Sequence, residues 1–365
     1  MLDFTSALYL GFEHASWSLP GWARLTLGKP AALEEVPGTF RVQRELAALI
    51  GCERVLMGSS TLHLFCDLFG MLARRNVALW IDEATYPIAR WATDRAAAFG
   101  APVRLFAHHS AASLRRALDT AGGAKPVIVT DGYCPVRGTQ APLRDYASCA
   151  AARGGLLVVD DTQALGVFGR RADSMVGYGS GGGGSLRHFN LQDPGIVVVS
   201  SLAKAFGVPM AMVGGSEAFV ENFRESGGTL VHCSPPSAAV ILAAQRALRV
   251  NAGWGDILRR RLANVVARFR RRLQGLLGIG GLFPVQPLKL PARMDARWLY
   301  GRLLGRGVRA VLHRDPGGGG SRISFVLSAR HGLSEIDCAV DCLLDALAGS
   351  HENTEGVRGD VTGLR

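Results

Sequence analysis

Short apolar runs alternate with longer amphipathic segments through the middle of the chain. Runs rich in Val, Ile and Leu predict strands, and apolar residues spaced three or four apart predict helices. The predicted strands cover residues 77–82, 103–106, 127–130, 156–160, 196–199 and 211–213, and the predicted helices cover residues 88–99, 111–121 and 143–152. Strands that alternate with helices are typical of an α/β protein with a mostly parallel sheet covered on both faces.

Several of these predicted strands end in polar residues. They are Asp82, Thr130, Asp131, Asp160 and Ser201. The carboxyl ends of parallel strands meet at one edge of a sheet, and ligands of open α/β sheets bind at that edge. We therefore expect a functional site there.

The pattern predicts two domains and a tail. Residues 45–250 carry the alternation and predict a large domain. Residues 251–349 hold a long arginine-rich helix followed by short strands and helices, which is typical of a smaller α+β domain, and we expect residues 1–44 to join it. Residues 350–365 are polar and are expected to form a frayed tail.

Composition excludes several classes of protein. Hydrophobic residues make up 48% of the 365 residues, which excludes a largely disordered chain. The seven cysteines form no C-x-x-C pair, which argues against a disulfide framework and against a zinc site, so no metal is predicted. The amino-terminal sequence does not resemble a signal peptide, and no apolar stretch reaches 18 residues. We expect a cytoplasmic protein that does not enter a membrane.

The net charge of +11 would attract an acidic partner such as a nucleotide, coenzyme A or an acidic carrier protein, and an arginine-rich genome is an equal explanation for it. Nucleic acid is not predicted as a partner, because no stripe of basic residues is interleaved with aromatic ones. The densest arginine run covers residues 259–272, on the polar side of a predicted helix. Both a solvated face and an anion-docking role remain open for these arginines.

Lys204 follows the apolar strand 196–199 and lies where the site is expected. Lysine is costly to bury, and an amine held beside an apolar strand loses its proton more easily and can attack a carbonyl. Asp160 ends the preceding predicted strand. A carboxylate beside a reactive lysine suits pyridoxal phosphate, whose ring nitrogen the carboxylate would keep protonated. A surface lysine and a helix-capping aspartate are the alternative interpretations.

Five segments together resemble the α-oxoamine synthases, a family of fold-type I pyridoxal phosphate enzymes. The segments are 3–11, 131–133 with 138–143, 158–169, 201–207, and 328–331 with 336–337. They occur in the family's order and at fitting spacing over nearly the whole chain. The resemblance implies a fold-type I transferase with a mostly parallel seven-stranded sheet in the large domain and a smaller α+β domain. It also implies pyridoxal 5'-phosphate as cofactor and a homodimer as the assembly.

The resemblance implies two catalytic residues. Lys204 would hold the cofactor covalently and move protons, and Asp160 would pair with its ring nitrogen. Tyr86 falls where the family stacks a histidine on the ring, and Gln163 falls where the family has a histidine near the ring hydroxyl.

The phosphate contacts are implied in the same way. Ser201 would reach the phosphate, and Ser59, Ser60 and Thr61 would present hydroxyl and backbone N–H groups to it from the start of an apolar helix.

The family's arginine for the substrate carboxylate aligns with Ser324. Arg322 lies two residues earlier on the same strand face, because side chains alternate with period two. Arg322 would replace the missing arginine as a carboxylate clamp, or it has only a structural or surface role.

The resemblance implies an acyltransferase that condenses an amino acid with an acyl thioester, on coenzyme A or a carrier protein, to an α-amino ketone, with loss of carbon dioxide. An aminotransferase of specialised biosynthesis is the alternative, because neither Tyr86 nor Gln163 supplies an imidazole. A degenerate, non-catalytic member is disfavoured, because both Lys204 and Asp160 are present.

Overall fold

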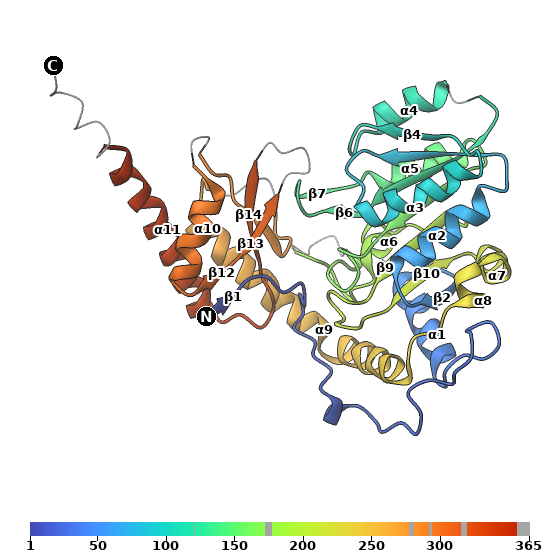
Figure 1. Cartoon of the computed structure of the whole chain (residues 1–365), viewed down its shortest axis with the longest axis horizontal. Coiled ribbons are helices and arrows are strands. Elements are labelled where there is room, and N and C mark those ends of the chain that lie inside the picture. The colour runs from blue at the N-terminus through green and yellow to red at the C-terminus, as the bar shows by residue number, and fades with distance from the viewer. Residues whose placement is uncertain (121, 172–176, 277–280, 292–293, 315–319, 356–365) are drawn as a thin grey trace, which may run out of the picture. The chain divides into compact units, whose positions relative to one another are not determined.

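The computed structural model describes all residues except 121, 172–176, 277–280, 292–293, 315–319 and 356–365. The chain divides into two compact units (Figure 1). Unit 1 comprises Met1–Tyr9, Pro135–Gly138 and Arg260–Arg365, and unit 2 comprises Leu10–Cys134 and Thr139–Arg259.

These bounds differ from the sequence-based division in three places. Residues 10–44 and 251–259 group with the larger unit, and residues 135–138 group with the smaller one. Residues 10–44 hold to the larger unit through backbone hydrogen bonds such as Ala32 N–H to the Leu230 carbonyl and Ala238 N–H to the Leu25 carbonyl. The hydrophobic pattern of the chain carries no signal for such irregular segments.

Unit 2 is built around a seven-stranded sheet in the order β2-β10-β9-β8-β5-β3-β4. The strands are β2 (Arg54–Gly58), β3 (Val77–Asp82), β4 (Val103–Phe106), β5 (Lys125–Asp131), β8 (Leu156–Asp160), β9 (Ile196–Ser201) and β10 (Ala211–Gly215). Strand β10 runs antiparallel to both β2 and β9, and the pairs from β9 to β4 are parallel. The expected mostly parallel seven-stranded sheet is confirmed.

The helices of unit 2 are α1 (Thr39–Ile50), α2 (Thr61–Leu72), α3 (Pro87–Ala98), α4 (Ala111–Asp119), α5 (Leu143–Ala151), α6 (Gly184–Phe189), α7 (Glu217–Ser226), α8 (Gly228–His232) and the first part of α9 (Ala238–Arg272). Helices α3, α4 and α5 lie within two residues of the predicted segments 88–99, 111–121 and 143–152. A short 3₁₀ helix, η1 (Ser16–Ser18), and a hairpin of β6 (Tyr133–Cys134) and β7 (Thr139–Gln140) complete the unit.

Alternate residues of the central strands form the core. Leu79 and Ile81 of β3, Val127 and Val129 of β5, and Val158 of β8 pack in one cluster with apolar residues of α2, α3 and α7. Helix α5 packs against β5 and β8. Burial of both sheet faces explains why these strands read as nearly continuous apolar runs.

Unit 1 contains a three-stranded sheet in the order β11-β14-β13 and a parallel pair of β1 with β12. Its elements are β1 (Leu2–Asp3), β11 (Val285–Pro287), α10 (Ala296–Gly305), β12 (Val308–Arg309), β13 (Val311–Arg314), β14 (Ser321–Val326), α11 (Leu333–Glu355) and the end of α9. Helix α11 extends into the segment predicted as a frayed tail, and residues 356–365 of that segment lie outside the described residues.

Arginine side chains of α9 pair with acids of α11. Arg268 donates to Asp337 at 2.8 Å, and Arg272 donates to Asp341 at 2.6 Å. These arginines of the run 259–272 therefore have a structural role. Within the described part of the chain, no helix has the length and apolar character needed to cross a bilayer.

Candidate active site

The carboxyl ends of four neighbouring strands form the polar edge that the sequence predicts. Strand β3 ends at Asp82, β5 at Asp131, β8 at Asp160 and β9 at Ser201. Asp131 is paired in register with Asp160, so the carboxylates of β5 and β8 lie on adjacent strands. Asp82, Asp131 and Asp160 are all buried.

Asp160 has 6% of its surface exposed. Its Oδ1 accepts a hydrogen bond from Thr162 N at 3.0 Å. Burial raises the pKa of Asp160, whereas bonds from Thr162 and the positive charge of Lys204 lower it. A buried carboxylate of this kind is stabilised by a cationic partner. A protonated ring nitrogen would supply such a partner.

Lys204 lies in a tight loop after β9, where Val208 N–H bonds to the Leu202 carbonyl and Gly207 N–H to the Lys204 carbonyl. The side chain is half-buried. Burial lowers the pKa of Lys204, and the negative charges of Asp160 and Asp131 partly offset this. A lowered pKa increases the fraction of neutral amine, which is the form that attacks a carbonyl. The structure thus brings Lys204 and Asp160 within electrostatic reach of each other, as the sequence predicts.

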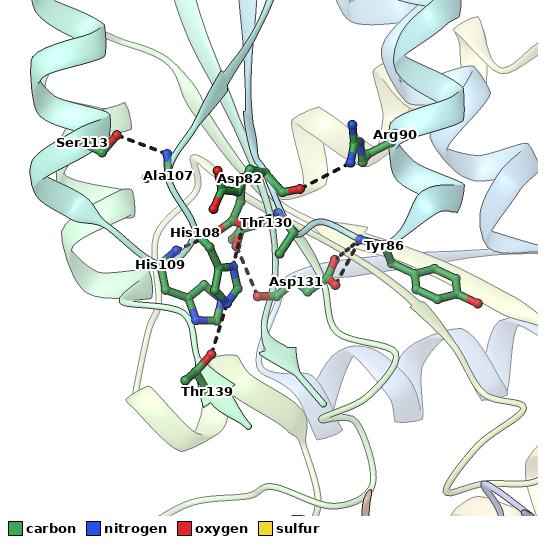
Figure 2. A network of polar contacts seen from close by, with 12 residues as sticks. Asp82, Tyr86, Arg90, Ala107, His108, His109, Ser113, Thr130, Asp131 and Thr139 are labelled. Carbon is green, nitrogen blue, oxygen red and sulfur yellow. Dashed lines mark hydrogen bonds and ion pairs between the residues drawn. The ribbon is translucent and has the colours of Figure 1, made fainter. Parts of the chain in front are cut away.

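Tyr86 precedes α3 and has 54% of its surface exposed. Its backbone N–H donates to both oxygens of Asp131, at 3.2 and 3.1 Å (Figure 2). An exposed aromatic ring held beside the polar edge fits a group that stacks on a cofactor ring.

Gln163 is half-buried in the turn that follows β8. The preceding residue ties this turn to the next strand, because Thr162 Oγ1 accepts a hydrogen bond from Ser201 N at 3.0 Å. The Ser201 hydroxyl accepts from Ala203 N at 3.2 Å. The turn after β8 and the start of the Lys204 loop are therefore held together.

The segment 59–61 forms the start of helix α2. Ser60 is the N-cap, and its hydroxyl accepts from His63 N at 3.4 Å. Ser59 donates its hydroxyl to the Ser234 carbonyl at 3.0 Å, and Thr61 is the first helical residue. The N-terminus of a 12-residue helix is a suitable place for a phosphate group.

Arg322 lies on β14 of unit 1 and is exposed. It lines a cavity of about 620 Å³ together with Arg137 and Lys289, and Asp295 also lines this cavity. Ser324, the position of the family's carboxylate arginine, is 4% exposed and pairs in register with Val311 and Pro287. The clamp role of Arg322 stays a prediction.

Sequence reasoning missed two features of the site. It placed Asp131 at the polar edge but gave it no role, although Asp131 holds the backbone of Tyr86. It also missed His108, which contacts Asp82 at 2.7 Å. His108 could have been found from its position in the sequence, because it follows strand β4 by two residues. Polar side chains at that position reach the carboxyl edge of the sheet.

The donor set fits pyridoxal phosphate. A buried carboxylate, a half-buried amine with a lowered pKa, an exposed aromatic ring and a helix N-terminus are what its ring nitrogen, aldehyde, ring face and phosphate require.

Comparisons with known proteins agree with this geometry. The family model for aminotransferase class I and II matches residues 20–307. The 8-amino-7-oxononanoate synthase of Thioalkalivibrio sulfidiphilus is 30% identical over 86% of this chain and 78% of its own length. The enzyme of the same name from Methylococcus capsulatus is 32% identical over 84% of this chain and 77% of its own length.

Solved structures show the same fold. A serine palmitoyltransferase from Sphingomonas wittichii aligns with a TM-score of 0.82 at 18% identity, over 96% of this chain and 88% of its own. An 8-amino-7-oxononanoate synthase from Francisella tularensis aligns with a TM-score of 0.73 at 20% identity, over 96% of this chain and 99% of its own. The fold is that of the fold-type I transferases. The chain belongs to the aminotransferase class I and II family, and within it to the α-oxoamine synthases.

Proposed function

We propose that this chain is a pyridoxal phosphate-dependent acyltransferase that condenses an amino acid with an acyl thioester. The observation that carries the proposal is the half-buried amine of Lys204 beside the buried carboxylate of Asp160, in a chain of the α-oxoamine synthase family. In the reaction, a bond forms between the α-carbon of the amino acid and the acyl carbonyl carbon. The carbon–sulfur bond breaks, the thiol leaves, and the α-carboxylate departs as carbon dioxide.

Each predicted site residue has a proposed role in binding. Lys204 and Asp160 would hold the cofactor at its aldehyde and ring nitrogen, and Tyr86 would lie against its ring. Gln163 would hydrogen-bond the ring hydroxyl, and the phosphate would be bound by Ser201, Ser59, Ser60 and Thr61. When bound, the cofactor supplies an electron sink for the charge that develops at the α-carbon.

Lys204 would also move the proton. Burial lowers the pKa of this amine, so more of it is neutral and able to accept the α-proton of the amino acid at Nζ. Burial raises the pKa of Asp160, and a cation beside it, such as a protonated ring nitrogen, would favour its charged form.

Unit 1 supports an anionic substrate. It holds 18 of the 41 lysines and arginines but 10 of the 30 acids, so it carries a net charge of +8 out of +11. Arg322, Arg137 and Lys289 line one cavity in it. We propose that Arg322 binds the carboxylate of the amino acid, and that the basic unit attracts the phosphate-bearing carrier of the acyl group.

An aminotransferase is the second candidate. It is favoured by one observation, the presence of Tyr86 and Gln163 where the family has histidines, because neither side chain carries an imidazole. An aminotransferase moves the amino group to an oxo acid and needs no acyl thioester.

The two candidates are separated by one assay. The holoenzyme is incubated with each of a panel of amino acids, with and without acyl thioesters. The synthase proposal expects thiol release and an amino ketone only when both substrates are present. Transfer of the amino group to an added oxo acid without thiol release would favour the aminotransferase.

Lys204→Ala tests the central residue. Borohydride should fix the cofactor to the wild-type chain, and Lys204→Ala should lose both this fixation and nearly all turnover. The matched control is Lys125→Ala, which removes an exposed lysine at the far end of β5. Borohydride fixation retained in Lys204→Ala would overturn the assignment.

We further propose that the chain acts as a homodimer in the cytoplasm. The support for a dimer is a set of large apolar side chains exposed near the start of unit 2, among them Trp17 at 87%, Leu33 at 76% and Phe40 at 64%. Exposed apolar surface of this kind often belongs to an interface. Light scattering of the purified holoenzyme tests the assembly, and a monomeric mass would reject it.

A further inference from the structure

Asp82 connects several segments at the carboxyl end of β3. Its side chain is 1% exposed. Oδ1 accepts from Ala84 N at 2.9 Å. Oδ1 also contacts His108 Nδ1 at 2.7 Å, and Oδ2 accepts from His109 N at 2.9 Å (Figure 2). The Asp82 carbonyl accepts from Thr85 N at 2.9 Å. One buried carboxylate thereby fixes the turn after β3 and the start of the turn after β4.

His108 connects this carboxylate to a third segment. Its side chain is 7% exposed, and its Nε2 lies 3.2 Å from the hydroxyl oxygen of Thr139 on β7. Burial alone would lower the pKa of His108, but hydrogen bonds with Asp82 and Cys134 raise it to about 9. A protonated ring would donate from both nitrogens, and an oxygen that can accept lies beside each of them.

The turn fixed by Asp82 leads directly to Tyr86. Ala84 and Thr85 are both bonded to Asp82, and the next backbone N–H, that of Tyr86, is bonded to Asp131. The backbone that carries the Tyr86 side chain is therefore held from the ends of both β3 and β5. Asp82 is held by His108, so the histidine acts on Tyr86 through the turn.

A metal site is the competing interpretation of these residues. Ligand atoms of Asp82, His108 and His109 lie within 4.8 Å of one another. The two imidazole rings, however, stack with centroids 3.6 Å apart and planes inclined by 26°. Lone pairs in nearly parallel planes do not converge on one ion, and the contact between His108 Nδ1 and Asp82 Oδ1 already occupies one ligand pair.

We propose that Asp82 and His108 form a positioning pair that sets the place of the Tyr86 ring at the cofactor edge of the sheet. Neither residue touches substrate. The inference rests on the proposed function, in which Tyr86 lies against the cofactor ring.

Two substitutions at His108 separate its two contacts. Asparagine carries an amide nitrogen near the place of Nδ1 and retains the bond to Asp82, whereas glutamine carries one near Nε2 and loses it. His108→Gln should weaken pyridoxal phosphate binding to the apoenzyme by about tenfold or more, the scale of one charge-assisted hydrogen bond. His108→Asn should stay within about threefold of wild type, as partial rescue predicts.

The control is His109→Asn. His109 has a positive φ of 49°, which asparagine adopts readily, and the backbone N–H that bonds Asp82 is retained. This variant should bind the cofactor as the wild type does. Equal losses in His109→Asn and His108→Gln would contradict the proposal, and so would cofactor binding that rises with added zinc.

A double-substitution cycle tests the route through Tyr86. Tyr86→Ala should weaken cofactor binding, and His108→Gln added to it should weaken binding by less than about twofold more, because the two changes act on one contact. If the fold-losses of cofactor affinity in the two single variants multiply in the double variant, His108 acts by another route, and the inference is overturned.

A readout without cofactor separates this inference from the proposed function. Amide hydrogen exchange in residues 84–86 of the full-length apoprotein should be about tenfold faster in His108→Gln than in wild type, and unchanged in His109→Asn. Unchanged exchange in His108→Gln rejects the positioning pair. A chain that shows the exchange difference but binds no pyridoxal phosphate rejects the proposed function alone.

Discussion

Buried carboxylates outnumber buried amines at the edge of the sheet. Asp131, Asp160 and Asp161 end two adjacent strands or follow directly after them, and burial raises the pKa of all three. Lys204 is the lysine whose charge acts on Asp160. The residue-scale chemistry of the site is therefore a group of carboxyls that burial makes costly to ionise, and a cationic ligand group beside them would favour their charged forms.

Asp161 gives a prediction about pH. Burial, opposed by the bonds from Ser185, raises its pKa to about 7. A carboxyl whose pKa is higher in the folded state binds more protons there, so it lowers stability as pH rises toward 7. Between pH 5.5 and pH 8.5 the free energy of unfolding should fall by about 2 kcal/mol more in wild type than in Asp161→Asn.

Denaturant unfolding of the apoprotein at several pH values measures this difference. Asp94→Asn, which changes an exposed acid on α3, is the matched control and should keep the wild-type slope. Parallel pH curves for wild type and Asp161→Asn would count against a raised pKa.

The sequence is sufficient to single out Lys204 and Asp160, because strand ends can be read from the apolar runs before them. It is not sufficient for Asp131 and His108. Their roles depend on the register that pairs β5 with β8 and on turns that bring residue 108 back to residue 82. His108 and Asp82 lie 26 positions apart, and the local spacing of apolar and polar residues cannot reveal a contact over that distance in the sequence.

At the scale of elements, predicted and observed bounds agree best for strands of the central sheet. Strands β3, β4 and β8 were predicted at their observed bounds, and α3 was displaced by one residue. The hairpin of β6 and β7 was not predicted, since strands of two residues are too short to show a period. It matters nonetheless, because β7 carries the Thr139 that contacts His108.

Helix α2 gives a prediction at this scale. Ser60 caps α2 and Ser110 caps α4 in the same way, each accepting from the N–H three residues on. Replacement of either serine by alanine should cost about 1 kcal/mol of stability. Ser60→Ala should also weaken pyridoxal phosphate binding by about tenfold, because α2 is the proposed phosphate site.

Calorimetry and cofactor titration of both variants measure these effects. The proposed role of the start of α2 is rejected if Ser110→Ala and Ser60→Ala change cofactor affinity equally.

For the whole molecule, the uneven charge predicts a salt effect. Unit 1 carries +8 of the net charge, and fields of exposed charges are screened beyond about 10 Å at 0.1 M salt. The kcat/KM for an acyl-coenzyme A donor should fall severalfold between about 0.02 and 0.3 M salt. The kcat/KM for a neutral N-acetylcysteamine thioester of the same acyl chain should change little with salt. An equal fall of kcat/KM for both donors would reject the proposal that the charge of unit 1 attracts the acyl donor.

The sheet order has a consequence for how the chain matures. Strand β10 lies between β2 and β9 in the sheet. During synthesis, β2 can therefore pair with its neighbour only after the ribosome has added some 150 more residues. Until then, β2 and β9 each present an open edge to other chains in the cell. A ribosome-bound nascent chain stalled before residue 211 should therefore aggregate or recruit chaperones. A chain stalled far enough downstream for β10 to have left the ribosome exit tunnel should do neither.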